Sequence, residues 1–504
     1  MIANFLDYFY SDIYDERVII NDLTVKELKE MVLTKIQTLS ENTIPAELNC
    51  LEFIIEILAR IFVEKDIKLD ETNKAKARTI TEFPAVDPTK VFVLFKTSGS
   101  CGEKKTIKKS LQNLLNESKN LISEFEFPED LTFISTTTPK HLFGFTFHFM
   151  LALNCAKLLT DEITTPEDIN IKNTCLITTP SFLEKMQKYN NTPVIKPSFI
   201  FSAGSALKPT VFKFAQDIAD NVIDIYGSTE TGIIAHRETS TENFKLFKSI
   251  QIEQKEDSTL VYTAYSAVSP VLINDKLTIN DNKIKIEGRT DRTFKIQEKR
   301  VNAAEIETLL NKISLIDDCY VFQHKDKLAC LTVLSQKGQD YFYKNGVVEL
   351  TKSLKSTIKN CFEIIPQKWK FTDEIPKTSS GKIDKEEIEK LFGLNLSLPL
   401  IVEKQADSNS ARIKLFFYRN CNFFKGHFDN FPLVPGVVQL YLAQYFSKKL
   451  FNTELCGQNR KLKFSNIIKP DKFIDLELEL LSNSISYKFV DETHKYSSGI
   501  LGKK

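Results

Sequence analysis

The sequence predicts an α/β protein with a mostly parallel sheet in a large first domain, followed by a small α+β domain and a C-terminal domain. Short continuous apolar runs alternate with longer segments of helical spacing, which is typical of strands covered by helices on both faces; the runs are 91–95, 131–134, 175–177, 199–201 and 222–225. Each run ends in a turn rich in Ser, Thr, Gly or Pro. Because ligands of such sheets bind at the carboxyl ends of strands, these turns are candidate binding sites.

The composition is that of an ordinary globular protein with several domains. The chain has 504 residues, of which 42% are hydrophobic and 26% charged, and this length suggests three or four domains. The 67 Lys and Arg against 66 Asp and Glu leave a net charge of +1, which argues against attraction of the whole chain to nucleic acid or to an anionic membrane. With 16 Gly and 17 Pro, collagen-like and low-complexity classes are excluded.

Three features predict a cytoplasmic protein without a transmembrane segment. The nine cysteines are scattered and contain no C-x-x-C pair, which favours free thiols over a disulfide framework or a zinc site. The N-terminus has no basic segment and carries Asp7 and Asp12, so no signal peptide is expected. The stretch 141–159 is apolar, but it contains two histidines, an asparagine and a lysine, which indicates a buried helix rather than a membrane span.

The regions on either side of the predicted sheet contain further elements. Residues 1–88 are expected to be helical, with a capping box at Thr24 and Glu27 and a second amphipathic helix over 48–62. The stretch 285–392 predicts the small α+β domain, with a helix from Ala303, strands around 320–322 and 328–334, and a helix near 348–361. The polar stretch 403–412 has linker composition, and about 90 residues follow it, enough for one small domain.

The motif Thr97-Ser-Gly-Ser-Cys-Gly-Glu-Lys-Lys105 follows the first predicted strand of the sheet. A loop rich in Ser and Gly exposes backbone N–H groups, and together with a nearby lysine it suits a polyphosphate. Gly99 and Gly102 are three residues apart, so the loop fits neither a Walker A motif nor G-x-G-x-x-G. By itself the motif is equally compatible with a tight turn.

Three more motifs follow in order. In 224–232, the carboxylate of Glu230 and the hydroxyl of Thr229 are ligands that Mg²⁺ can share with phosphate oxygens, and Tyr226 offers a flat face for a base. The other two are Gly-Arg-Thr-Asp-Arg-Thr-Phe-Lys at 288–295 and Pro-Lys-Thr-Ser-Ser-Gly-Lys-Ile at 376–383.

In this order the four motifs resemble the core motifs of the adenylate-forming (ANL) superfamily of acyl-CoA synthetases, acyl and aryl acid ligases and adenylation domains, over residues 85–390. The resemblance implies ATP and Mg²⁺ as cofactors, with Lys382 bridging the acid and the α-phosphate and Asp291 at the hinge of a small lid domain. It also implies phosphate contacts at Thr97, Ser98, Gly99, Ser100, Gly102 and Lys105, adenine contacts at Gly204, Ser205, Ala206 and Tyr226, cofactor binding at Gly227, ribose contacts at Asp275 and Arg289, and metal ligation by Glu230 and Thr229.

The chemistry agrees with this resemblance and leaves the acid open. Attack of a carboxylate on a phosphate joins two anions, so the site must supply positive charge and orientation. Glu298 stands where the superfamily has a glycine that admits a pantetheine arm, so the resemblance predicts adenylation more strongly than thioester formation. His141, Phe143 and Gly144 lie where the superfamily builds its acyl pocket, with no aspartate for an amino group between Lys140 and Leu159. An uncharged fatty, 3-hydroxyacyl or aryl acid is expected, although core packing explains the aromatic residues equally well.

The last motif lies at 423–440 and contains Gly-His-Phe followed by Pro-Leu-Val-Pro-Gly-Val-Val-Gln-Leu. It resembles the hot-dog-fold 3-hydroxyacyl-ACP dehydratases, particularly those of aryl-polyene clusters, over residues 410–502. The resemblance implies that His427 is the base for the α-proton and that N–H groups near Gly436 polarise the thioester carbonyl. Tyr441 occupies the position of the usual acid, so the domain is either a dehydratase or a binder of acyl thioesters.

The sequence therefore predicts a ligase fused to a dehydratase-like domain. The expected domains are a shortened adenylate-forming domain over 1–288, a lid over 289–395, a linker over 396–411 and a hot-dog domain over 412–504. The expected activity is transfer of an activated acid to a phosphopantetheine thiol of CoA or of an acyl carrier protein, in fatty-acid or polyene-type biosynthesis, by a homodimer formed through the hot-dog domain. Two alternatives stay open: a ligase whose hot-dog domain is catalytically inactive, and a non-enzymatic acyl-nucleotide sensor or scaffold.

Overall fold

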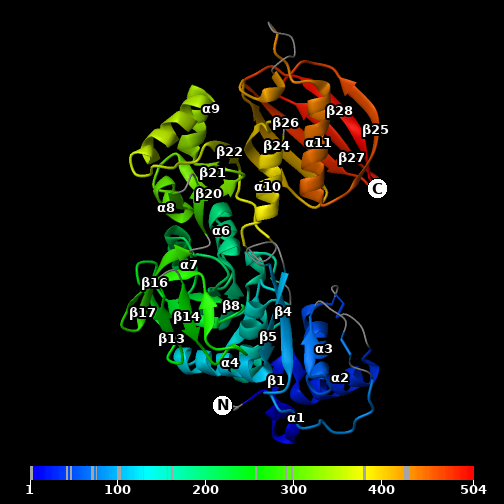
Figure 1. The fold of residues 1–504 in the computed structure, drawn as a ribbon. Coiled ribbons are helices and arrows are strands. Elements are labelled where there is room, and N and C mark those ends of the chain that lie inside the picture. The colour runs from blue at the N-terminus through cyan, green and yellow to red at the C-terminus, as the bar shows by residue number, and fades with distance from the viewer. Residues whose placement is uncertain are drawn as a thin grey trace. The chain divides into compact units, whose positions relative to one another are not determined.

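In the computed structural model the chain forms two compact units (Figure 1). The first comprises Met1–Asp291 with Thr378–Lys382, and the second comprises Arg292–Lys377 with Ile383–Lys504. The structure describes residues 4–40, 44–45, 48–69, 73–74, 77–98, 104–128, 130–155, 157–160, 163–255, 258–289, 292–296, 299–378, 382–394, 396–424 and 431–503.

An eleven-stranded sheet forms the centre of the first unit, in the order β16-β17-β12-β11-β10-β9-β8-β6-β7-β1-β2. Its middle, from β10 to β1, is parallel, and the strands at both ends pair antiparallel. The strands are β1 (Val18–Ile20), β2 (Leu23–Thr24), β6 (Thr132–Ser135), β7 (Lys157–Leu158), β8 (Thr174–Thr178), β9 (Phe199–Ser202), β10 (Asn221–Ser228), β11 (Gly232–Arg237), β12 (Phe244–Leu246), β16 (Asp275–Asn280) and β17 (Lys283–Arg289).

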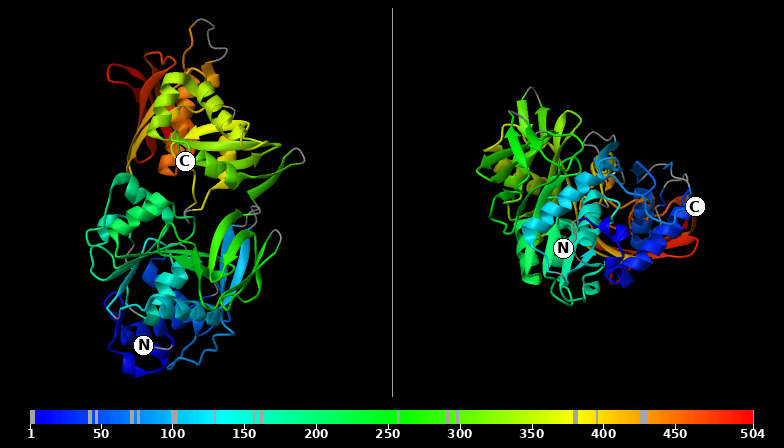
Figure 2. Two further views of the ribbon diagram at one scale, coloured as in Figure 1. Left: turned by 90° about the vertical axis from the view of Figure 1, so that its left-hand side faces the viewer. Right: turned by 90° about the horizontal axis from the view of Figure 1, so that it is seen from below.

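The central strands are apolar on both faces because helices cover both faces (Figure 2). Leu176 and Ile200 pack in one core with α6 and α7, and their neighbours Ile177 and Phe201 pack in the other with α4 and α5. The helices of this unit are α1 (Asp7–Tyr10), α2 (Val25–Thr38), α3 (Cys50–Ile61), α4 (Leu111–Phe125), α5 (Leu151–Cys155), α6 (Pro180–Tyr189) and α7 (Pro209–Ile218), with the 3₁₀ turns η1 (Asp12–Tyr14) and η3 (Pro166–Asp168).

Four of the five predicted sheet strands are β6, β8, β9 and β10, which confirms the α/β prediction. The fifth, predicted at 91–95, is part of β4 (Phe92–Ser98) and lies in a separate sheet with β3 (Asp66–Lys68) and β5 (Lys104–Ser110). A third sheet contains β13 (Gln251–Gln254), β14 (Thr259–Tyr262) and β15 (Val271–Ile273).

Local sequence signals explain the helix starts and the buried apolar segment. The capping box at the start of α2 is present, because Glu27 N–H donates to Thr24 Oγ1 and Thr24 N–H donates to the Glu27 carboxylate. The stretch predicted as a buried helix contains the π-helix η2 (Gly144–Met150) and α5, both largely buried, followed by β7. Among the described residues, no helix combines the length and the apolar character that crossing a membrane requires.

The second unit begins with the small α+β domain that the sequence predicts. A hairpin of β18 and β19 leads into α8, and a sheet of β20, β21 and β22 packs against α8, α9 and α10. The backbone of α9 breaks at Gly346, where φ is +79°, so the helix predicted near 348–361 is its second half. The bounds are β18 (Thr293–Ile296), β19 (Lys299–Asn302), α8 (Ala303–Leu310), β20 (Ile316–His324), β21 (Lys327–Leu334), α9 (Gln336–Lys359), β22 (Lys368–Thr372) and α10 (Lys385–Gly393).

The C-terminal part of the unit is a six-stranded antiparallel sheet, in the order β23-β24-β26-β27-β28-β25, packed against the single long helix α11 (Figure 1). This is the arrangement expected of a hot-dog domain. The bounds are β23 (Leu400–Ala406), β24 (Ser410–Phe417), η5 (Asn422–Phe424), α11 (Gly436–Phe451), β25 (Leu455–Phe464), β26 (Lys472–Leu480), β27 (Ser484–Val490) and β28 (Lys495–Lys503).

The predicted linker over 396–411 differs from the structure. Residues 400–406 form β23, which pairs with β24 at the edge of the six-stranded sheet. The stretch is polar because an edge strand exposes much of its surface to water, and most residues of 403–410 are exposed. The polar composition therefore marks an edge strand and its hairpin turn.

The lid and the hot-dog domain share a core within the second unit. Leu400 and Phe416 belong to the same apolar cluster as the lid residues of α8 and α9. The ring of Phe416 lies 4.9 Å from that of Tyr343 on α9, and Lys404 Nζ lies 2.6 Å from the Asp373 carboxylate. Aromatic packing and an ion pair thus join the two domains.

We predict that Phe416→Ala destabilises both domains of the second unit, because the ring is buried and packs against residues of each. The expected loss in the free energy of unfolding is about 3–5 kcal/mol. Hydrogen exchange under native conditions should show lower protection in 292–378 and in 431–503. Val348→Ala, an exposed position of α9, is the control, and loss of protection in the hot-dog domain alone would contradict the shared core.

Candidate functional site

The two ends of the predicted phosphate loop lie on the paired strands β4 and β5. Thr97 pairs with Lys105 and Ser98 pairs with Lys104, so the two ends of the loop are held side by side. The residues between them, including Gly99, Ser100 and Gly102, lie outside the described residues. The strand pairing thus brings Lys105 beside Thr97, the first residue of the motif.

The predicted adenine turn and the Glu230 turn follow neighbouring parallel strands. Ser202 at the end of β9 lies beside Asp224 of β10, so Gly204-Ser205-Ala206 and the segment from Tyr226 onward leave the same edge of the sheet. Gly204 has φ of +104°, a backbone conformation that favours glycine. The ring centroid of Tyr226 lies 5.9 Å from that of Phe244.

The turn between β10 and β11 presents Thr229 and Glu230. Ser228 pairs with Gly232, and the Ser228 and Thr231 hydroxyls are 3.0 Å apart, while Ser228 N–H donates to Thr231 Oγ1. Gly227 must be glycine because a Cβ there would lie 2.3 Å from the carbonyl oxygen of Gly232. The turn is therefore closed by its own hydroxyl groups and by the strand pairing.

The two predicted ribose contacts are paired by the backbone. Asp275 at the start of β16 is the Cα partner of Arg289 at the end of β17. The preceding Gly288 has φ of +137°. Residues fourteen positions apart in the sequence are thus neighbours in the structure.

The predicted acyl-pocket residues lie where the π-helix begins. Gly144 is buried against the loop before it, since a Cβ there would lie 2.3 Å from the Thr138 carbonyl oxygen. Phe143 is half-buried with its ring 4.7 Å from that of Phe147, and His141 is exposed. The fully buried rings of Phe145 and Phe147 pack against Phe95 and Phe201.

An ion pair that no sequence motif predicted joins the two strands next to Tyr226. Asp224 is buried on β10, and its carboxylate lies 2.8 Å from Arg237 Nη2 on β11. Burial raises the pKa of Asp224 to about 6, although Arg237 opposes the shift. An acid inside the otherwise apolar run 222–225 was the available signal.

The Lys382 loop is closed by its backbone. Lys377 pairs with Ile383 in an isolated bridge, and Thr378 N–H donates to the Lys382 carbonyl oxygen at 2.7 Å. Lys382 is exposed. The predicted hinge Asp291 and the Glu298 position lie outside the described residues.

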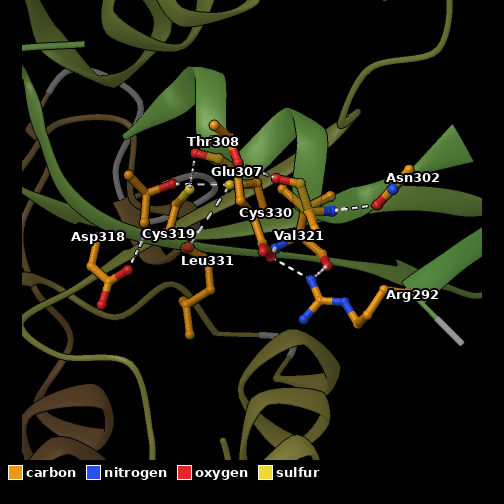
Figure 3. A network of polar contacts seen from close by, with 11 residues as sticks. Arg292, Asn302, Glu307, Thr308, Asp318, Cys319, Val321, Cys330 and Leu331 are labelled. Carbon is orange, nitrogen blue, oxygen red and sulfur yellow. Dashed lines mark hydrogen bonds and ion pairs between the residues drawn. The ribbon is translucent and has the colours of Figure 1, made fainter. Parts of the chain in front are cut away.

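Arg292, the residue after the predicted hinge, makes several polar contacts with the lid (Figure 3). Arg292 donates to the carboxylate of Glu307 and, at 2.8 Å, to the carbonyl oxygen of Val321, and its guanidinium lies 4.3 Å from the ring centroid of Tyr320. Glu307 also accepts from Val321 N–H at 2.6 Å, and burial raises its pKa. These contacts fix the start of the lid domain.

In the hot-dog domain, the predicted base His427 lies outside the described residues. Gly436 begins α11, and a Cβ there would lie 2.9 Å from the ring of Phe464. Tyr441 is half-buried and its ring is stacked 6.3 Å from that of Tyr445. Gln439 is buried near the start of the helix, where its Nε2 donates to Val434 and its Oε1 has no partner among the described residues.

The described residues contain no cluster of three His, Cys, Asp or Glu side chains that could hold a metal alone. Mg²⁺ bound with a nucleotide requires fewer protein ligands, because it is typically held by one or two carboxylates together with phosphate oxygens. The Glu230 turn fits such a role.

The eight cysteines in the described part of the chain are free thiols.

Two families match separate parts of the chain. The AMP-binding enzyme family matches residues 22–260, and the ApeI dehydratase family matches residues 403–500. A D-alanine–D-alanyl carrier protein ligase of Listeria monocytogenes serotype 4b (strain F2365) is 21% identical over 359 residues, covering 58% of this chain and 69% of the relative. The corresponding Staphylococcus aureus (strain JH9) ligase is 23% identical over 381 residues, covering 65% and 76%.

Solved structures show the same fold. ATP-bound MatB from Rhodopseudomonas palustris superposes with a TM-score of 0.61 at 13% identity, covering 78% of this chain and 99% of the other. The anthranilate CoA ligase AuaEII, in complex with anthranoyl-AMP, gives a TM-score of 0.57 at 13% identity with the same coverage.

We predict that Asp224 makes stability fall as the pH rises from 4 to 7. Its pKa is higher in the folded chain than in the unfolded one, so below pH 4 both states hold the proton and no penalty exists. Between pH 4 and pH 6 the unfolded carboxyl ionises first, and ionising the buried group then costs about 3 kcal/mol. Chemical denaturation should show that the difference in the free energy of unfolding between wild type and Asp224→Asn changes by this amount between pH 4 and pH 7. A difference that does not depend on pH would contradict the prediction.

Proposed function

We propose that this chain, which joins an adenylate-forming ligase of the AMP-binding enzyme family to a C-terminal ApeI-like dehydratase domain, activates a carboxylic acid with ATP and transfers it to a phosphopantetheine thiol. The observation that supports this best is the common edge of β9 and β10, from which the Gly204 turn and the Glu230 turn both leave. Gly204, Tyr226 and Gly227 are the residues we assign to adenine, and Asp275 and Arg289 those we assign to ribose.

Lys382 is assigned to the adenylation step. The acid's carboxylate attacks the α-phosphate of ATP, a bond forms between carboxylate oxygen and phosphorus, and pyrophosphate leaves. Because both reactants are anions, the ammonium group of Lys382 lowers the barrier by neutralising charge between them. The loop over 97–105 holds the β- and γ-phosphates through its N–H groups and Lys105.

Glu230 and Thr229 would hold Mg²⁺ with the phosphates. The metal supplies positive charge to the phosphate oxygens when it is bound. Glu230 belongs to a turn that is closed by Ser228 and Thr231.

The acid is proposed to have an uncharged tail. The curated relatives are named as ligases of D-alanine, but the segment 141–159 of this chain contains no acidic residue to pair with an amino group. His141, Leu142 and Phe143 are the side chains next to Gly144 that remain partly or fully accessible. A fatty, 3-hydroxyacyl or aryl acid fits them better.

The acceptor is proposed to be the thiol of an acyl carrier protein, with CoA as the alternative. The curated relatives are named for a carrier protein, and AuaEII is named for CoA. A carrier protein would also serve the dehydratase domain, since both domains would then act on one tethered acyl group. We place these two reactions, ligation and dehydration, in the cytoplasm.

The hot-dog domain is proposed to remove water from a 3-hydroxyacyl thioester. His427 takes the α-proton, the N–H groups at the start of α11 near Gly436 polarise the thioester carbonyl, and the hydroxyl leaves as water with a proton supplied by Tyr441. A domain without this activity would still bind acyl thioesters.

The hot-dog domain is also proposed to dimerise along β25. This edge strand exposes Leu462 and Phe464, which are 39% and 50% accessible, beside Val437 at the start of α11, which is 73% accessible. An edge strand with exposed apolar side chains is a template for pairing with another strand. A second copy of the chain is the proposed partner.

We predict that Lys382→Ala lowers carboxylate-dependent pyrophosphate exchange by on the order of 100- to 1,000-fold, because it removes the charge that neutralises the reacting anions. Exchange is measured with a panel of fatty, 3-hydroxy and aryl acids that includes D-alanine. Lys390→Ala, an exposed lysine of α10, is the control and should retain wild-type exchange. Wild type without exchange for any acid would favour the non-enzymatic sensor.

We predict that His427→Ala lowers dehydration of 3-hydroxybutyryl thioester by about 100- to 10,000-fold, the usual contribution of a general base. The rate is followed through the absorbance of the conjugated product. His494→Ala changes an exposed histidine of the same domain and should have no effect. Equal rates for wild type and His427→Ala would leave acyl binding or dimerisation as the role of the domain.

A further inference from the structure

Two ionisable side chains are buried directly behind the turn that carries Glu230. Lys109 on β5 is 0% exposed and Glu117 on α4 is 2% exposed. Charged side chains are rarely buried to this degree unless they are paired. Neither residue belongs to the motifs that predict the ligase activity.

Glu117 holds the chain immediately after the turn. Ile233 N–H donates to Glu117 Oε1 at 2.9 Å. The carboxylate also packs against Gly232, where φ is +74° and a Cβ would lie 3.0 Å from Glu117 Oε1. A buried carboxylate that accepts a backbone N–H fixes that segment, because the hydrogen bond has no competition from water.

Lys109 holds the other side of the same turn. Its ammonium group donates to the carbonyl oxygen of Tyr265, and the Cβ of Tyr265 lies only 2.8 Å from where a Cβ on Gly232 would be. Thr263, two residues before this tyrosine, donates its hydroxyl to the Thr231 carbonyl oxygen at 3.3 Å. The turn is thus held between α4 and the segment after β14.

Burial disfavours the charged forms of both Lys109 and Glu117, and each residue opposes the shift in the pKa of the other. Burial lowers the pKa of Lys109, and the carboxylates of Glu117 and Glu230 both oppose that shift. Lys109 therefore lies within electrostatic reach of both acids. It also stands on β5, the strand that follows the phosphate loop, whereas Glu230 stands on the turn after β10.

We propose that Lys109 and Glu117 are positioning residues that fix the Ser228–Gly232 turn and tie the orientation of Glu230 to the paired strands that flank the phosphate loop. This inference rests on the proposed function, in which Glu230 helps to bind Mg²⁺ and ATP. Groups that orient a metal ligand typically contribute 10- to 100-fold to metal affinity or activity. The two residues themselves contact neither reacting atom.

The test compares Glu117→Gln, Glu117→Ala and Lys109→Met with wild type. The glutamine keeps an oxygen for Ile233 N–H and removes only the charge, whereas alanine removes both. We expect Glu117→Ala and Lys109→Met to raise the KM for ATP and the Mg²⁺ concentration for half-maximal pyrophosphate exchange by about tenfold. Glu117→Gln should recover part of this loss.

The matched control is Glu56→Gln on α3, a buried glutamate whose carboxylate lies 2.6 Å from Arg60. It should lower thermal stability without changing either Mg²⁺ dependence or the KM for ATP. If the Glu117 and Lys109 variants behave like this control, the inference is overturned. If Glu117→Ala does not fold, Glu117→Gln and Lys109→Met decide. Wild type without any exchange would instead overturn the proposed function itself, so the two failures are distinguishable.

Discussion

The parallel pairing of β9 with β10 is the constraint on which the site depends. Ser202 lies beside Asp224, and this register places two turns that are more than twenty residues apart at one edge of the sheet. The register is strongly specified because both faces are buried: Val222 packs in one core, whereas Ile223 and Ile225 pack in the other. A slip by one residue would exchange these faces.

The features that could be predicted from the sequence are those that depend on neighbouring residues or on a repeated pattern of apolar residues. The capping box of α2 depends on residues three positions apart, and the buried strands are continuous apolar runs, so both could be recognised without the fold. The pairing of Asp275 with Arg289 is also nearly local, since β16 and β17 form a hairpin. The assignment of these residues to the nucleotide came from the family resemblance and remains a prediction.

Features that depend on contacts between residues far apart in the sequence could not be predicted. β5 reads Lys-Lys-Thr-Ile-Lys-Lys-Ser, which resembles a solvated surface segment, yet Lys109 is fully buried. Its burial is set by Tyr265, 156 positions away along the chain, and by the helix that carries Glu117. Similarly, the polar composition of β23 indicated a linker because an edge strand and a linker expose similar surfaces.

The same edge strand also joins the small α+β domain to the C-terminal sheet domain within the second unit. The match to the dehydratase family begins at residue 403, but Leu400, three residues earlier on the same strand, lies in the core cluster of the lid. Phe416, on the partner strand β24, lies in that cluster as well, and Lys404 between them pairs with Asp373. One hairpin therefore supplies apolar surface to the lid and the edge of the sheet to the dehydratase. Removing either domain would therefore expose apolar surface of Leu400 and Phe416, while the C-terminal sheet and α11 also bury a core of their own.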